Sequence, residues 1–188
     1  MISHIGTNTI ETERLILRRF KYSDNEAMRK NWVSDSNIQS MYREPVYTTE
    51  EEVNELLDRY ISSYENSDYY RWAIIDKDSC ECIGQIAYYF VDSNNEFAEI
   101  EYCISSAFQC RGLATEATKA VIAYGFDKIN LNKVQICTMD INSASKKVIE
   151  KCGFVYEGTL REFFIINGKH IGRLYFSILR SEYNNNLC

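Results

Sequence analysis

The sequence is poor in the residues that bind metal ions and in the residue that most often interrupts helices. It contains two histidines, His4 and His170, and one proline, Pro45, in 188 residues. The closely spaced cysteines Cys80 and Cys82 are not accompanied by a second pair or a nearby histidine, which a zinc site would require. No run of 18 apolar residues is present, so no segment is typical of a membrane-spanning helix. We therefore expect neither a metal nor a membrane partner.

Positive charge is also scarce, with 21 Lys and Arg against 27 Asp and Glu and a net charge of −6. This balance argues against nucleic acid as a partner and mildly favours cationic substrates such as amines. The seven cysteines are odd in number and scattered along the chain, which is typical of reduced thiols. The segment Met1–Gly6 lacks the charged start and apolar core of a signal peptide. We therefore expect a cytoplasmic protein.

The apolar residues follow strand spacing and helix spacing in turn, which predicts an α/β pattern. The chain length favours one domain, residues 1–188. Strands are expected at 12–20, 70–75, 83–91, 97–104, 134–138, 163–166 and 173–179. Helices are expected at about 23–33, 49–64, 113–124 and 143–152. The dipeptide Asn167-Gly168 predicts a tight hairpin turn between the last two strands.

A glycine-containing loop, Gln109 to Glu116, joins a predicted strand to a predicted helix. A helix N-terminus presents unpaired backbone N–H groups and the positive end of the helix dipole, and both favour an anion. Such a place can hold a pyrophosphate without a metal, and Arg111 adds a planar cation beside it. The loop therefore predicts a phosphate-bearing ligand. The alternative is that Gly112 only shapes the turn into the helix.

The same loop resembles a known signature. Gln109-x-x-Gly112-x-Ala114 matches Gln/Arg-x-x-Gly-x-Gly/Ala, the acetyl-CoA signature of the GNAT acetyltransferases. The chain is similar to the RimJ/RimL-type branch of that superfamily, which includes spermidine acetyltransferases, in the segments Glu13–Arg18, Ala98–Tyr102, Asn142–Phe154, Tyr156–Arg161 and Ile166–Lys169. This resemblance covers nearly the whole chain.

The resemblance implies the GNAT fold, of the α/β (α+β) class. That fold has a central mixed, mostly antiparallel sheet of about seven strands with a V-shaped splay and about four flanking helices. It also implies acetyl-CoA as cosubstrate, with the pantetheine arm in the splay. The implied cofactor-binding residues lie at a strand end, in the loop and at the next helix start: Cys103, Ile104, Gln109, Cys110, Arg111, Gly112, Leu113, Ala114, Thr115, Asn142 and Ser145. Asn142 is equally suited to be a helix N-cap.

Acetyl transfer to a primary amine requires a group that removes the amine proton. Glu99 and Glu101 are two residues apart on one strand and therefore share a face, which makes both candidates. The alternative is a pair of surface glutamates. The resemblance favours Glu99, which matches the Glu of the family's Ala-Glu-Ile-x-Tyr run. It also implies that Ser145 protonates the departing thiolate, although a serine on a helix surface often has no role.

On the acceptor side the resemblance is incomplete. Ile149, Phe164 and Gly172 stand where the family often has a tyrosine acid, a glutamate base and an aspartate. We expect an N-acetyltransferase that moves acetyl directly to a protein N-terminal α-amine, a polyamine or another small amine, with a homodimer left open. The alternative is a non-catalytic acyl-CoA-binding module. A Rossmann-type nucleotide binder is disfavoured, because Gly-x-Gly-x-x-Gly is missing.

Overall fold

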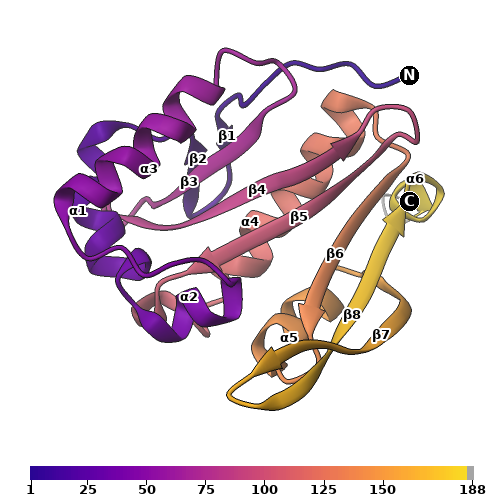
Figure 1. The fold of residues 1–188 in the computed structure, drawn as a ribbon. Helices are drawn as coiled ribbons and strands as arrows, with labels where there is room; N and C mark the ends of the chain where they lie inside the picture. The colour runs from indigo at the N-terminus through magenta and orange to yellow at the C-terminus, as the bar shows by residue number, and fades with distance from the viewer. Residues whose placement is uncertain (186–188) are drawn as a thin grey trace. The chain divides into compact units, whose positions relative to one another are not determined.

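A computed structural model describes residues 1–185 of the chain (Figure 1). The strands are β1 (Ile10–Glu11), β2 (Leu15–Arg18), β3 (Tyr70–Asp76), β4 (Cys82–Asp92), β5 (Phe97–Ile104), β6 (Lys133–Met139), β7 (Val155–Ile166) and β8 (Lys169–Leu179). The α-helices are α1 (Asn25–Met28), α2 (Ser36–Tyr42), α3 (Glu50–Ser63), α4 (Leu113–Tyr124), α5 (Ser143–Lys151) and α6 (Arg180–Asn185). Single π-helical turns at 29–33 and 125–129 extend α1 and α4.

The strands form one mixed sheet with the hydrogen-bonded order β1-β2-β3-β4-β5-β6-β8-β7. The pairs β1/β2, β2/β3, β3/β4, β6/β8 and β7/β8 are antiparallel, and β5/β6 is parallel. The parallel ladder pairs 97–100 with 133–136 and then stops, although β5 continues to Ile104 and β6 to Met139. The expected fold class is confirmed. Within residues 1–185 the strands number eight and the α-helices six, rather than about seven and about four.

The chain divides into two compact units. The N-terminal unit comprises His4–Tyr88 and Tyr102–Val121. The C-terminal unit comprises Met1–Ser3, Tyr89–Glu101 and the chain from Ile122 onward. Strands β4 and β5 and helix α4 each contribute residues to both units.

In the N-terminal unit, α1 and α3 pack with β2 and β3 (Figure 1). Helix α3 begins at a capping box, in which Thr49 Oγ1 accepts from the Glu52 N–H and the Glu52 carboxylate accepts from the Thr49 N–H. Its apolar face reaches a core that also holds Trp32 and Met28. Trp72 and Tyr88 are buried beside each other in the same unit, and their polar atoms bond to backbone carbonyls. Both side chains are therefore part of the hydrophobic core.

In the C-terminal unit, alternation along β5 and β6 buries Ala98, Ile100, Val134 and Ile136. Strands β7 and β8 form a long hairpin, drawn in orange and yellow in Figure 1. Its turn is the expected Asn167-Gly168, whose φ angles of 50° and 74° both lie in the left-handed region. This is the combination that a type I′ turn requires, and it confirms the hairpin.

No helix within residues 1–185 is long and apolar enough to cross a lipid bilayer. The same residues contain no group of three or more His, Cys, Asp or Glu side chains that could hold a metal ion.

Candidate functional site

The loop that precedes α4 adopts left-handed backbone at two positions, Cys110 with φ 60° and Gly112 with φ 81°. The loop begins where Gln109 Nε2 donates to the Ile104 carbonyl at 3.1 Å. Cys110 and Arg111 are exposed, and the Arg111 guanidinium lies 5.0 Å from the centre of the Phe108 ring. The helix begins with Leu113, Ala114 and Thr115, and the buried Leu113 side chain anchors its first turn. The structure thus brings these sequence-predicted residues together in the N-terminal unit.

A β-carbon at Gly112 would approach only Arg14 Nη2, at 3.5 Å, so the space beside the loop is open. The acidic residue in the first turn of α4, Glu116, is turned toward the start of β2. There it accepts hydrogen bonds from Thr12 Oγ1 at 2.6 Å and from Arg14 Nε at 2.7 Å. A carboxylate engaged in this way leaves the helix N-terminus available to another anion.

Arg14 also belongs to this site, although the sequence indicated it only as part of the family resemblance. Its Nη1 donates to the Arg111 carbonyl at 2.9 Å, so it touches the loop directly. The two residues are 97 positions apart, and no local pattern shows that they meet.

The last residues of β5, Cys103 and Ile104, are both buried. Gly84 of β4 faces them, and a β-carbon on it would lie 2.2 Å from the Cys103 carbonyl oxygen. Glycine at this position therefore allows the close approach of the two backbones. Just beyond, the Ser105 N–H donates to the Ile83 carbonyl at 2.8 Å, which continues the contact with β4.

Helix α5 begins at Asn142 as its N-cap, because Asn142 Oδ1 accepts from the Ser145 N–H at 3.0 Å. Asn142 therefore acts as an N-cap, which is one of its two predicted roles. The other role, a contact with pantetheine through its side-chain amide nitrogen, stays a prediction. Ser145 lies in the first turn and is partly exposed. Both residues belong to the C-terminal unit.

Glu99 of β5 is buried and ion-paired with Arg173 of β8. Glu99 Oε1 accepts from Arg173 Nη2 at 3.1 Å, and Glu99 Oε2 accepts from Gln135 Nε2 at 3.0 Å. The Arg173 guanidinium also lies 4.8 Å from the ring centre of Tyr175 and 5.4 Å from that of Phe163. Both Glu99 oxygens are thus engaged, whereas Glu101 on the same strand is half-buried. Glu99 is therefore not a surface glutamate, and its charge is compensated by Arg173.

Two further groups contact Arg173. Nη2 donates to the Tyr89 hydroxyl at 3.1 Å and to Cys137 Sγ at 2.9 Å. Burial, aided by the negative charge of Glu99, raises the pKa of the Cys137 thiol to about 12. Burial likewise raises the pKa of the Tyr89 hydroxyl. Both groups are therefore protonated at neutral pH, and Cys137 is not a thiolate nucleophile.

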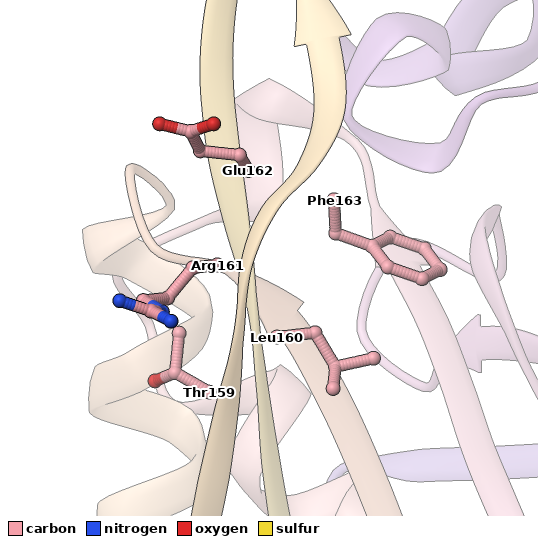
Figure 2. A pocket seen from close by; sticks show the side chains of 5 residues that line it. All are labelled: Thr159, Leu160, Arg161, Glu162 and Phe163. Atoms are coloured by element: carbon pink, nitrogen blue, oxygen red, sulfur yellow. The ribbon is translucent and has the colours of Figure 1, made fainter.

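Strand β7 bulges between Leu160 and Phe164, where its register with β8 shifts and Glu162 has φ 53°. The bulge forms an open hollow of about 570 Å³ lined by residues 159–163 (Figure 2). Figure 2 shows Leu160 and Phe163 on one side of the strand, with Thr159, Arg161 and Glu162 on the other. Phe163, which lines the hollow, also lies beside the Arg173 guanidinium.

The three positions at which the chain departs from the family pattern have distinct surroundings. Ile149 is fully buried in the core, and its aliphatic side chain cannot act as an acid or a base. Phe164 stacks edge-on against Phe163. The Gly172 N–H donates to Asp140 Oδ2 at 2.9 Å, and a β-carbon at Gly172 would lie 2.7 Å from that oxygen. A carboxylate thus reaches Gly172 from the end of β6.

Comparison with known proteins finds the same architecture. The family model described as an acetyltransferase (GNAT) domain matches residues 14–155. The protein p20 of Bacillus licheniformis, described as an uncharacterized N-acetyltransferase, is 29% identical over 175 residues, which are 93% of this chain and 98% of p20.

Two solved structures are informative. The spermidine N-acetyltransferase of Vibrio cholerae, in complex with CoA and spermine, is 28% identical with a TM-score of 0.79 over 93% of this chain and all of that chain. The ribosomal-protein-S5-alanine acetyltransferase of Vibrio fischeri is 21% identical with a TM-score of 0.79, over 94% of this chain and 98% of that chain. The second likeness concerns the fold alone.

Proposed function

The chain belongs to the GNAT acetyltransferases, in the RimJ/RimL-like branch, and we propose that it transfers the acetyl group of acetyl-CoA directly to a primary amine. Proteins of this family are N-acetyltransferases that use acetyl-CoA. The observation that carries the proposal is the loop before α4, with its left-handed Cys110 and Gly112, its exposed Arg111 and the open space beside it.

The loop fits a pyrophosphate by its own geometry. Helix α4 begins with Leu113 and Ala114, and the N–H groups at such a position precede the first acceptor that the helix itself supplies. Glu116, the acid that could repel an anion there, is held away by Thr12 and Arg14. We propose that Gln109 to Thr115 hold the pyrophosphate, with main-chain groups of Cys103 and Ile104 and the side chain of Asn142 serving the pantetheine arm. When bound, acetyl-CoA supplies an activated thioester carbonyl.

The acceptor amine must lose a proton, since a lysine-like amine with a pKa near ~10.4 is mostly charged at neutral pH. We propose that a carboxylate of β5 takes this proton, directly or through water. The family resemblance favours Glu99, whereas the geometry favours Glu101. Glu99 is buried with both oxygens hydrogen-bonded, one of them to a guanidinium. Its oxygens are therefore less available to accept the amine proton than those of the more exposed Glu101.

The departing thiolate makes a smaller demand, because a thiol with a pKa near ~8.5 leaves readily without a proton donor. We propose Ser145, in the first turn of α5, as an auxiliary donor. Transfer is direct rather than through an acetylated cysteine, and the protonated state of Cys137 supports this route.

For the acceptor we propose a primary amine of the three types considered: a protein N-terminal α-amine, a polyamine or another small amine. The spermidine acetyltransferase of V. cholerae, solved with spermine, supports the amine class. We also propose one acetyltransferase domain over residues 1–188, because β4, β5 and α4 run through both compact units without a linker. We propose a homodimer as the oligomeric state to be tested. A cytoplasmic location is supported by the six described cysteines, all free thiols.

A non-catalytic acyl-CoA-binding module is the second candidate, favoured by the fully buried Ile149 at the position of a family acid. Release of free CoA from acetyl-CoA separates the two, measured with a thiol reagent across a panel of polyamines, small amines and N-terminal peptides. An acetyltransferase releases CoA only when an acceptor is present. A binding module stabilises with acetyl-CoA and releases no CoA with any amine.

A further inference from the structure

Arg14, the residue before β2, contacts both the first turn of α4 and the loop that precedes this helix. All of these residues belong to the N-terminal unit. Its Nε and Nη2 each lie 2.7 Å from Glu116 Oε2, and its backbone N–H donates to Glu116 Oε1 at 2.8 Å. Thr12 Oγ1 donates to the same Oε1 at 2.6 Å. The remaining terminal nitrogen, Nη1, donates to the Arg111 carbonyl at 2.9 Å.

The direction of one peptide unit follows from the last contact. The C=O and N–H of a trans peptide point in opposite directions. Because the Arg111 carbonyl is held toward Arg14, the N–H of Gly112 points away from Arg14. No described residue accepts a hydrogen bond from that N–H. It is therefore presented on the side of the loop opposite the guanidinium, together with the N–H groups that open α4.

This orientation is not secured by the loop itself. The 111–112 peptide rotates about ψ of Arg111 and φ of Gly112, and glycine, here with φ 81°, places little restriction on this rotation. Rotation of the 111–112 peptide would replace an N–H by a carbonyl oxygen on the anion side, which repels phosphate. The hydrogen bond from Arg14 is the contact that opposes this rotation.

We propose that Arg14 and Glu116 are positioning residues for the cofactor's pyrophosphate: Glu116 fixes the Arg14 guanidinium, and Arg14 fixes the peptide whose N–H faces the phosphate. The inference rests on the proposed function, in which this loop binds acetyl-CoA. These roles predict that the two residues affect the affinity for some ligands and not for others. A ligand with a pyrophosphate depends on the orientation of the 111–112 peptide, whereas pantetheine, which has none, does not.

The experiment measures dissociation constants for CoA and for pantetheine by calorimetry or competition, in wild type, Arg14→Gln and Glu116→Gln. The expected result is that either variant weakens CoA roughly ten- to hundredfold, the range for loss of a hydrogen bond to a charged group, and leaves pantetheine unchanged. Arg14→Lys keeps the charge but cannot contact Glu116 and the Arg111 carbonyl through a planar fork, and it is expected to weaken CoA nearly as much.

Arg18→Gln is the matched control. Arg18, the last residue of β2, forms a comparable two-point pair with Asp24, at 2.8 and 2.7 Å, without contact to the loop. This variant is expected to lower the melting temperature without changing the affinity for CoA. The inference is overturned if Arg14→Gln and Glu116→Gln weaken CoA and pantetheine equally, or weaken neither, or if Arg18→Gln weakens CoA to the same extent. Failure of wild type to bind CoA at all would instead contradict the proposed function.

Discussion

Arg173 Nη2 lies 3.1 Å from Glu99 Oε1, and the two charges form a buried pair between β8 and β5. Only 19% of the arginine side chain and 8% of the glutamate side chain are exposed. Gln135 occupies the second carboxylate oxygen, and aromatic rings lie beside the guanidinium. The pair therefore ties the central parallel strand to the C-terminal hairpin, and its charges compensate each other.

Removal of Arg173 alone should be more damaging than removal of both partners. Arg173→Met leaves Glu99 as an uncompensated buried charge, which costs about 3–5 kcal/mol of unfolding free energy. The double variant Glu99→Gln/Arg173→Met removes the stranded charge and should recover part of the loss. Urea unfolding of the wild type, both single variants and the double variant measures this coupling. Additive effects of the two substitutions would show that the pair does not interact in solution.

Glu101→Gln should lower kcat about 10²–10⁴-fold, the usual contribution of a general base. Its affinity for acetyl-CoA should stay nearly unchanged, because the proposed pyrophosphate site in the loop before α4 does not include Glu101. Glu99→Gln should act more on stability than on kcat, since Glu99 is held by Arg173 and Gln135. Steady-state kinetics and thermal unfolding of the two variants decide the assignment. A large loss of kcat in Glu99→Gln, with Glu101→Gln fully active, would return the base to Glu99.

Gly112→Glu should abolish stabilisation by acetyl-CoA. A glutamate at φ 81° is strained, and its carboxylate competes with the anion for the N-terminus of α4. In the wild type, ligand at 100 times its dissociation constant adds about 2.7 kcal/mol of stability. The melting temperature with and without acetyl-CoA reports the difference. A full ligand-induced shift in the variant would mean that the pyrophosphate binds elsewhere.

The pH dependence of stability should contain a contribution from Glu116. Its partial burial favours a raised pKa, but the hydrogen bonds from Thr12 and Arg14 and the charge of Arg14 lower the pKa below the ordinary 4.5. A lowered folded-state pKa stabilises the fold above the unfolded value and loses that stabilisation as pH falls through the folded value. The wild type should therefore lose stability below about pH 4.5 relative to Glu116→Gln. Parallel pH profiles of the two proteins would contradict this account.

The sequence predicted what is encoded locally. The alternation from Phe97 to Ile104 predicted β5 with its observed bounds, and Asn167-Gly168 predicted the hairpin turn. Strand β7 is longer than expected, beginning at Val155 rather than near 163, because most residues of its first half are exposed and lack an alternating apolar pattern. The short helices α2 and α6 were missed, since neither carries a long apolar stripe.

The contacts that modify the candidate site could not be predicted in the same way. The partner of Glu99 is 74 residues away, and the meeting depends on the registers of β5 with β6 and of β6 with β8. The sequence therefore predicted Glu99 and Glu101 as equivalent candidate bases on one face, whereas only Glu99 is paired with Arg173 in the structure. The pairing of Arg14 with Glu116 likewise spans 102 residues. Loop and strand patterns predict where a ligand binds, whereas tertiary pairing decides which side chains are already engaged.

The most direct test is the stoichiometry of acetyl transfer. Free CoA and acetylated amine are measured together, by thiol reagent and by mass spectrometry, for each acceptor in the amine panel. The account predicts that at least one amine releases CoA, that each CoA released is matched by one acetylated amine, and that no CoA is released without an acceptor. Tight binding of acetyl-CoA with no acetylated product from any amine would contradict the account and favour the binding module.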